Sequence, residues 1–460
     1  MDWIKLLDQI DSFVWGPPLL ILLVGTGVFL SFRLKFLQVF RLPFALKLIF
    51  KAENDGTGDV NSFGALCTAL AATIGTGNII GVATAIKAGG PGALFWMWLA
   101  AFFGMATKYA EGLLAIKYRS KDANGQIAGG PMHYILKGMG EKFRPLAVFF
   151  AVSGVLVALL GIGTFPQVNA IVSSINGTFG IPAEVSGILL TILVALIVIG
   201  GLKSIANVST KVIPFMSVLY VTICLVVVFT SFDKIPQAVN LVISNAFTGT
   251  AAVGGFLGAT MQMAVRNGVA RGVFSNESGL GSAPIAAAAA KTKWPAEQGL
   301  ISMTGTFIDT IIICTLTGLS IVVTGVWQTD LQGTELTSAA FGTVMPVLGP
   351  VLLTLSLALF AFTTIIGWNY YGERCCEFLF GVKSIMPYRI VFIAMVALGA
   401  FIKLEAIWLI ADIVNGLMAL PNLIALVCLS GVIVAETKLY VKHLKKESGK
   451  IRSVGSGTRI

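Results

Sequence analysis

The sequence carries very little charge for its length, and this shortage excludes an ordinary soluble protein. Only 12% of the 460 residues are charged, whereas 56% are hydrophobic, and the mean hydropathy is +0.87. A soluble domain has about 25% charged residues, because its surface must be compatible with water. The charges present here are too few to cover a soluble body of this size. The composition therefore predicts a polytopic membrane protein.

Residues that bind metals or form nucleophile–base pairs are also scarce. The two histidines, His133 and His443, lie in polar segments, and the six cysteines form no CxxC pair. An intramembrane enzyme would need a nucleophile with its base, or a set of metal ligands. We therefore expect no enzyme and no resident cofactor. The net charge of +10 comes without a basic stripe interleaved with aromatic residues, so we expect no nucleic-acid partner.

Eleven apolar stretches are long enough to be membrane spans, since a helix needs about 20 residues to cross a hydrocarbon core of about 30 Å. They are centred in residues 19–32, 63–87, 94–118, 145–174, 185–201, 212–231, 251–290, 298–326, 344–380, 388–402 and 404–441. The eleventh contains a run of helix breakers at 415–422, so twelve spans remain open. We expect an all-α protein of about eleven transmembrane helices in the lipid bilayer, with no appended soluble domain.

The distribution of Lys and Arg predicts the orientation of these spans. Alternate loops, beginning with the loop after the first span, hold most of the cations. The opposite loops hold only Lys5, Lys87, Lys234 and Lys403. Because cytoplasmic loops are enriched in Lys and Arg, we expect the N-terminus outside and the C-terminus in the cytoplasm. The basic tail at 446–460 would then be cytoplasmic, and the protein would lie in the cell membrane.

Two spans contain segments that are typical of interrupted helices. Residues 71–81 read AATIGTGNIIG, and residues 275–284 read SNESGLGSAP. Each segment combines glycine with Thr, Ser or Asn at mid-membrane depth, and Pro284 suits the first turn of a helix that starts again. An interrupted helix in a bilayer leaves backbone N–H and C=O groups without partners, which is tolerated where they line a cavity. Both segments therefore predict a break that faces a ligand site.

The positions of the two breaks indicate a secondary transporter. Interrupted helices at corresponding positions of two halves are the best sequence indication of such a transporter's binding site. Here the two interrupted spans each begin a set of five spans. Because five is an odd number, the two interrupted spans cross the membrane in opposite directions, as an inverted repeat requires. We expect an extra span and linker at 1–60, a first repeat at 61–235 and a second at 236–445. The alternative is that these glycines only allow close helix packing.

Three polar or aromatic features in other spans leave alternatives open. Thr363 and Thr364 either bond back to their own helix or, with the carbonyl of Phe360, form a cation site. Asp309 is a functional candidate because an acid inside a membrane is costly, but a structural cap or ion pair is an equal alternative. Trp368 is either a core residue or an aromatic lid over a small cationic amine.

Three long motifs resemble the signature of the alanine/glycine:cation symporters. They are GGPGALFWMW at 89–98, GNIIGVATAI at 77–86 and GVARGVFSNE at 268–277. The resemblance covers roughly the first to the tenth span. It implies sodium-coupled import of alanine and glycine, with D-alanine as a further candidate, by alternating access. It also implies a LeuT-like 5+5 inverted-repeat fold with two discontinuous helices and one extra N-terminal helix, and no obligate protein partner.

The resemblance also implies a site. Amides of the first break would hold the substrate carboxylate, and the second break would receive the ammonium. The substrate residues expected from it are Thr73, Gly75, Thr76, Gly77, Asn78, Phe165, Gln167, Phe274, Ser275, Asn276 and Trp368. The coupling sodium ion is expected at Ala71, Ile74, Phe360, Thr363 and Thr364, with Asn78 and Asp309 as a second candidate position.

Two other functions remain open from the residues alone. One is a sodium- or proton-coupled carrier of another small solute, such as a nucleobase. Competition between alanine and other solutes would distinguish it from an alanine carrier. The other is a channel, which would not accumulate its solute against a gradient.

Overall fold

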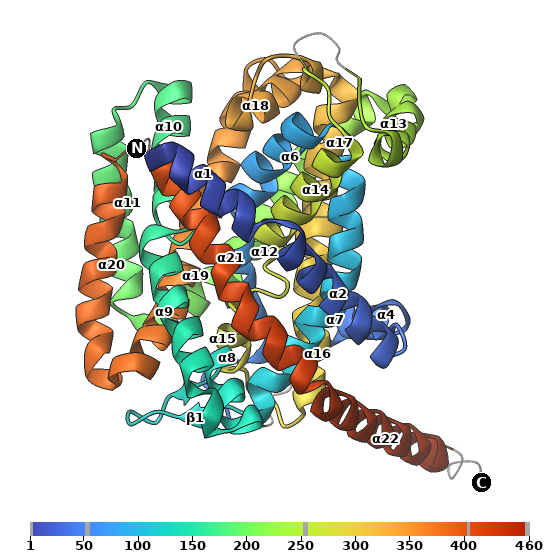
Figure 1. Ribbon diagram of the computed structural model, residues 1–460, viewed down its shortest axis with the longest axis vertical. Coiled ribbons are helices and arrows are strands. Elements are labelled where there is room, and N and C mark those ends of the chain that lie inside the picture. The colour runs from blue at the N-terminus through green and yellow to red at the C-terminus, as the bar shows by residue number, and fades with distance from the viewer. Residues whose placement is uncertain (1–2, 51–55, 252–255, 403–404, 456–460) are drawn as a thin grey trace.

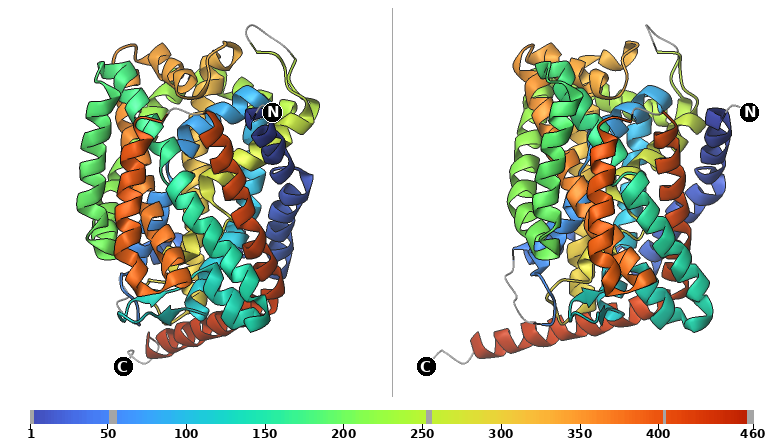
Figure 2. Two further views of the ribbon diagram at one scale, coloured as in Figure 1. Left: turned by 60° about the vertical axis from the view of Figure 1, so that its left-hand side comes forward. Right: turned by 90° about the vertical axis from the view of Figure 1, so that its left-hand side faces the viewer.

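The computed structural model describes residues 3–50, 56–251, 256–402 and 405–455, and it is mostly helical. Figure 1 shows a bundle of helices, and Figure 2 shows residues 3–14 in its upper part and residues 430–455 across its lower end. The helices of the first half are α1 (Trp3–Val14), α2 (Pro17–Arg33), α3 (Leu37–Phe40), α4 (Leu42–Ile49), α5 (Ser62–Thr73), α6 (Val82–Gly89), α7 (Ala93–Lys117), α8 (Pro131–Tyr134), α9 (Arg144–Leu160), α10 (Phe165–Phe179), α11 (Ala183–Val198) and α12 (Gly201–Thr230).

The second half continues the bundle in the same manner. Its helices are α13 (Ile235–Thr248), α14 (Met261–Asn276), α15 (Ala283–Ala287), α16 (Pro295–Thr306), α17 (Thr315–Thr324), α18 (Gly333–Val344), α19 (Leu348–Phe380), α20 (Ile385–Gly399), α21 (Glu405–Cys428) and α22 (Ser430–Gly455). Two π-helical segments, η1 (Gly77–Gly81) and η5 (Phe307–Cys314), join helices within spans. The prediction of a helical membrane protein is confirmed.

The number of spans is only partly settled by helix length. In the described ranges, eight helical stretches are long and apolar enough to cross a membrane, or nine if one bent pair counts as a span. Two further expected spans correspond to α11, which is a shorter apolar helix, and to the interrupted pair α14 and α15. Eleven spans therefore stay a prediction.

Both expected interruptions are present. The first separates α5 from η1, where Ile74 is extended, and the two halves are bent by 53°. The second separates α14 from α15, where Glu277 has φ +56° and Gly279 and Gly281 have φ +90° and +81°. The backbone turns sharply there because glycine adopts positive φ without a steric cost. Pro284 lies in the first turn of α15, as expected.

The fourth expected span, at 145–174, is not one continuous helix. α9 ends at Leu160 and α10 begins at Phe165. Gly163 lies in the break between them, and a Cβ there would lie 2.9 Å from the Cβ of Trp368 on α19. This span therefore contains a further interruption beside the two that were expected. The third interruption matters for the site, because it begins the helix that carries Phe165 and Gln167.

The breakers at 415–422 do not interrupt the last span. α21 runs through Pro421 and ends at Cys428, and α22 follows as a separate helix across the end of the bundle (Figure 1). The expected start of the tail, residue 446, lies inside α22. One small departure from an all-α chain is an antiparallel hairpin of β1 (Ser120–Lys121) and β2 (Ile127–Ala128).

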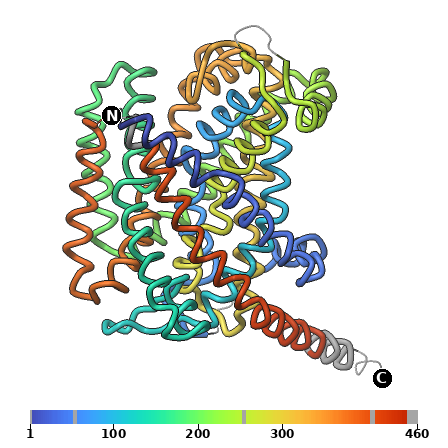
Figure 3. The backbone as a smooth tube through the Cα atoms, viewed as in Figure 1, coloured from blue at the N-terminus to red at the C-terminus, as the bar shows by residue number. Residues whose placement is uncertain are grey.

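The interrupted helices lie inside the bundle. α14 packs along η1 and α6, while α5 packs against α12 and α19. Figure 3 shows the same bundle as a backbone trace. Thr76, Ser275 and Asn276 are buried, so the two breaks are interior features rather than surface loops.

Candidate functional site

Three backbone segments meet at the interruptions. A Cβ on Gly77 would lie 3.0 Å from the Cα of Ser275, so η1 and α14 touch directly. A Cβ on Gly75 would overlap the hydroxyl of Thr364 on α19. Glycine suits both positions, because a side chain at Gly75 would overlap Thr364 and one at Gly77 would force Ser275 to shift. The first break is thus held between the second break and α19.

The amides freed by the first break point to side-chain oxygens. The N–H of Gly75 donates to Asn78 Oδ1 at 2.9 Å, and the N–H of Thr76 donates to Gln167 Oε1 at 3.3 Å. Gln167 Nε2 in turn donates to the hydroxyl of Thr76 at 3.0 Å. The two amides are therefore oriented toward acceptor oxygens of the kind that a carboxylate also offers. Gln167 reaches them from the start of α10.

The second break is stabilised by its own polar side chains. Asn276 Oδ1 accepts from the N–H of Ser278 at 2.9 Å, and Asn276 Nδ2 donates to Thr310 Oγ1 at 3.0 Å. The Asn276 side chain is therefore engaged within the break in this conformation. The hydroxyl of Ser275 donates to Asp309 Oδ2 at 2.9 Å.

Asp309 joins the two breaks. Its Oδ1 accepts from Asn78 Nδ2 at 2.6 Å, while Oδ2 accepts from Ser275 at 2.9 Å and from Thr310 at 2.7 Å. The carboxylate is fully buried, and hydrogen bonds to a charged group are stronger than neutral ones. The structure thus brings Asn78 and Asp309 together. Thr73 is not part of this group, because its hydroxyl donates back to Ala69 O at 2.7 Å.

Most oxygens of the expected sodium position lie close together. The carbonyl of Phe360 accepts from Thr363 at 2.9 Å and from Thr364 at 3.0 Å. The hydroxyl of Thr364 also lies 3.3 Å from the carbonyl of Ile74 in the first break. The two threonines therefore bond back to α19, and Thr364 also bridges to the first break, while the cation site stays a prediction. Ala71 is buried on α5, near its end. Oxygen atoms are the ligands that hard cations take.

The expected aromatic wall lies at the third interruption. Phe165 is the first residue of α10 and is buried. Trp368 is fully buried, packs against Gly163, and makes an edge-on contact with Tyr371, with ring centroids 5.3 Å apart. The interruption between α9 and α10 therefore places Phe165 and Gln167 of α10 beside Trp368 of α19, close to the first break.

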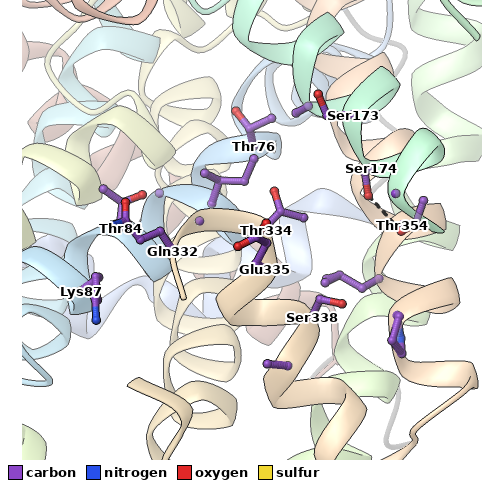
Figure 4. Close-up of a pocket in the computed structure, with 18 of the residues that line it drawn as sticks. Thr76, Thr84, Lys87, Ser173, Ser174, Gln332, Thr334, Glu335, Ser338 and Thr354 are labelled. Carbon is purple, nitrogen blue, oxygen red and sulfur yellow. Dashed lines mark hydrogen bonds between the residues drawn. The ribbon is translucent and has the colours of Figure 1, made fainter. Parts of the chain in front are cut away.

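An open cavity of about 1710 Å³ reaches the first break from one end of the bundle (Figure 4). Of the expected substrate residues, Thr76 and Phe274 line it. The rest of its wall comes mainly from α6, α10, α18 and the start of α19. Figure 4 labels Thr84, Lys87, Ser173, Ser174, Gln332, Thr334, Glu335, Ser338 and Thr354. We call this cavity the vestibule. The other expected residues lie beneath it, outside its lining.

Glu111 on α7 is a site residue that the sequence interpretation missed. Its Oε1 accepts from the N–H groups of Gly279 and Gly281 at 3.1 and 3.2 Å, and from Asn422 Nδ2 at 2.6 Å. The amides freed by the second break are therefore held by a carboxylate of the protein itself. The available signal was the same as for Asp309, namely an acid inside an apolar span.

The two arginines of the seventh span have partners away from the breaks. Arg271 Nη2 lies 3.0 Å from Asp412 Oδ2 on α21, and its guanidinium lies 5.5 Å from the ring centroid of Phe274. Arg266 donates to the hydroxyl of Ser12 on α1 at 3.2 Å. Arg271 also lines the vestibule, so one of these cations faces the path to the first break.

Comparison with known proteins agrees with this geometry. Residues 1–453 match the family model described as the sodium:alanine symporter family. A sodium/alanine symporter, AgcS, of Methanococcus maripaludis is 49% identical over 456 residues, which cover 97% of this chain and 99% of that protein. An uncharacterized transporter of Haemophilus influenzae is 58% identical over 443 residues, which cover 96% of this chain and 97% of that protein.

The chain is also similar, at lower identity, to a symporter of another amino acid and to a solved structure. A probable sodium/glutamine symporter, GlnT, of Bacillus subtilis is 37% identical over 444 residues, which cover 96% of this chain and 91% of that protein. The crystal structure of MhsT in complex with L-phenylalanine superposes with a TM-score of 0.54 at 11% identity, covering 83% of this chain and 99% of that one. At this identity the match indicates a shared fold and nothing about the cargo.

Proposed function

Because the chain belongs to the sodium:alanine symporter family, we propose that it imports alanine together with sodium, and that glycine and D-alanine are further substrates. The family and the relatives support the assignment of this chain as a sodium-coupled amino-acid symporter in a membrane. The identity of the cargo is our proposal. It is favoured by the 49% identity to a sodium/alanine symporter, compared with 37% to a probable sodium/glutamine symporter.

The observation that carries the proposal is the meeting of the two breaks at Gly77 and Ser275. The N–H groups of Gly75 and Thr76 are oriented toward acceptors, which suits the carboxylate of an amino acid. The carbonyl side of the second break, near Ser275 and Asn276, suits the ammonium. Phe165, Gln167 and Trp368 would limit the side chain of the cargo to a methyl group or little more.

Sodium would lie between α19 and the first break. The carbonyls of Ala71, Ile74 and Phe360 and the hydroxyls of Thr363 and Thr364 would be its ligands. An ion there would fix the first break against α19 and so raise the affinity for alanine. A second ion position at Asn78 and Asp309 is part of the proposal, since that carboxylate already joins the two breaks.

One coupled sodium ion is sufficient to drive accumulation. An ion that enters at about −100 mV gains about 2.3 kcal/mol. A roughly tenfold sodium gradient adds about 1.4 kcal/mol. Together these free energies would sustain a roughly 500-fold accumulation of a zwitterion such as alanine, because the zwitterion itself moves no net charge.

The proposed layout is a 5+5 inverted repeat after one extra span, with the N-terminus outside and the C-terminus in the cytoplasm. Its support is that the vestibule opens beside α18, at the end opposite α22 (Figures 1 and 2). α22 carries exposed Lys438, Lys442, Lys445 and Lys446, which favours the cytoplasmic side. The conformation described is then open to the outside and closed to the inside.

Uptake of labelled alanine into proteoliposomes tests the proposal. With sodium outside we expect accumulation, and with lithium or potassium we expect little. Unlabelled glycine and D-alanine should compete, whereas glutamine and nucleobases should not. Gly75→Leu should abolish uptake, because its side chain would collide with Thr364. If glutamine inhibits sodium-driven uptake and alanine does not, the cargo is a larger amino acid and not alanine. Uptake that sodium does not stimulate would contradict the coupling.

A further inference from the structure

The end of the bundle opposite the vestibule is closed by the chain segments that adjoin both interrupted helices. Residues 56–60 lead into α5, residues 288–292 follow α15, and the β1–β2 hairpin follows α7. Val60 and Ala290 form a parallel bridge between the first two segments. We call these three segments the closed-end clasp. They meet around the side chain of Arg119.

Arg119 contacts both segments that adjoin the interrupted helices. Its Nη1 donates to the carbonyls of Ala288 and Ala290 at 2.9 and 2.7 Å. Its Nη2 donates to the carbonyls of Thr57 and Thr292 at 2.6 and 3.1 Å. The planar guanidinium presents several donors in a fixed fork, so one side chain satisfies four carbonyls at once. A lysine ammonium cannot reproduce this geometry.

The segments around Arg119 approach so closely that no path for a solute remains between them. A Cβ on Gly58 would lie 2.5 Å from Lys291 N, and one on Gly56 would lie 2.7 Å from the carbonyl carbon of Thr292. The N–H of Asp59 donates to Ala289 O at 2.8 Å, and its Oδ2 accepts from the N–H of Ile127 at 2.7 Å. Asp59 therefore ties the segment before α5 to the hairpin that directly follows Arg119.

We propose that Arg119 is a positioning residue for transport, whose guanidinium holds the inner ends of both interrupted helices together while the vestibule is open. Release of its four carbonyls allows α5 and α15 to separate and the cargo to leave toward the cytoplasm. This inference rests on the proposed function, because it assumes alternating access. It assigns the closing of the inner side to a residue outside the substrate and sodium positions.

The test compares reporters at the two ends of the path. One cysteine replaces Ala65, which is buried on α5 beneath the clasp together with Ile116 and Ala290. The other replaces Thr84 in the vestibule. Both are placed in a background with Cys428→Ser, because Cys428 is an exposed cysteine. Labelling rates with a polar maleimide are measured on the purified full-length protein without sodium or amino acid.

Arg119→Gln should raise labelling at the Ala65→Cys reporter about tenfold, because the shorter, neutral amide cannot hold the four carbonyls that the guanidinium holds. It should also lower labelling at the Thr84→Cys reporter about twofold, because molecules that open inward close their vestibule. Lys117→Gln is the matched control. That residue lies on the same side and pairs with Glu436 of α22 instead, so both rates should stay unchanged.

Two results would overturn the proposal. Unchanged rates at both reporters would show that the guanidinium does not hold the clasp closed. A rise at Ala65→Cys alone would show local fraying rather than a change of the transport state. If Arg119→Gln does not fold, Arg119→Lys and Asp59→Asn decide, since each should shift both reporters in the same directions by a smaller factor. The labelling needs neither ion nor substrate, so its failure is separate from a failure of sodium-coupled uptake.

Discussion

At the scale of single residues, Thr364 can be tested directly, because its hydroxyl bridges from α19 to the first break. It lies 3.0 Å from Phe360 O and 3.3 Å from Ile74 O. Thr364→Val keeps the shape and removes that oxygen. We expect the sodium concentration for half-maximal uptake to rise about tenfold, as the loss of one good polar ligand implies. Thr364→Ser keeps the hydroxyl and should behave nearly like wild type. Equal sodium activation in both variants would place the ion elsewhere.

His133 gives a pH-dependent prediction outside the spans. Burial, together with the nearby cations Lys137 and Arg374, lowers the pKa of His133 to about 4. Its unfolded pKa is about 6.5, so between these values the unfolded chain binds a proton that the folded chain does not. Stability therefore falls as the pH drops from about 6.5 toward 4.

The measurement is the melting temperature in detergent as a function of pH. His133→Gln removes the titrating group, so its melting temperature should fall less than that of wild type between about pH 7 and 4.5. The difference should correspond to on the order of 2–3 kcal/mol at the acidic end. Parallel curves for the two proteins would show that His133 is protonated as readily in the folded protein as in the unfolded chain.

At the scale of elements, the second break depends on a residue from a neighbouring helix. Glu111 accepts from Gly279, Gly281 and Asn422, and it is fully buried. Glu111→Gln replaces hydrogen bonds to a charged group with neutral ones. We expect a loss of about 2 kcal/mol in stability and weaker alanine binding, because the break loses its fixed geometry. The readouts are thermal unfolding and binding calorimetry. Glu184→Gln, an exposed acid at the start of α11, should change neither.

The three helix interruptions differ in how readily they can be predicted from the sequence. The first two could be predicted, because in both segments glycines stand beside Thr, Ser or Asn at mid-membrane depth. The third was missed although Gly161, Gly163 and Thr164 carry the same signal, since apolar residues on both sides disguise so short an interruption. Conversely, Pro421 lies inside α21 without a break, and Asn422 beside it donates to Glu111 and to Gly279 O.

The partners of the site could not be predicted in the same way. Asn78 and Asp309 are 231 residues apart, and Glu111 lies 168 residues from Gly279. A sequence shows that each of these polar groups needs a partner, because an unpaired polar group in a membrane is costly. It does not show which distant helix supplies that partner, since this depends on the packing of the whole bundle. The resemblance to a family, rather than periodicity, supplied the residues of the sodium position.

At the scale of the whole molecule, the vestibule and the clasp are the two ends of the proposed transport path, so cargo should affect them in opposite ways. Binding of sodium and alanine at the breaks should favour closure over the cargo, because a closed state makes more contacts with it. Ser338→Cys on α18 lines the vestibule, whereas Glu184→Cys at the start of α11 is exposed outside it. In the Cys428→Ser background, sodium with alanine should slow labelling of the first about fivefold and leave the second unchanged.

Sodium alone provides the discriminating condition for the same pair of reporters. If the ion fixes the first break against α19 without closing the bundle, labelling at Ser338→Cys should stay fast until alanine is added. If sodium alone slows it to the full extent, closure would not require the cargo, and the ion could cross by itself. A symporter must avoid that leak, because each uncoupled ion dissipates the gradient that drives uptake. Fast labelling with sodium and slow labelling with both ligands is therefore the pattern that coupled transport requires.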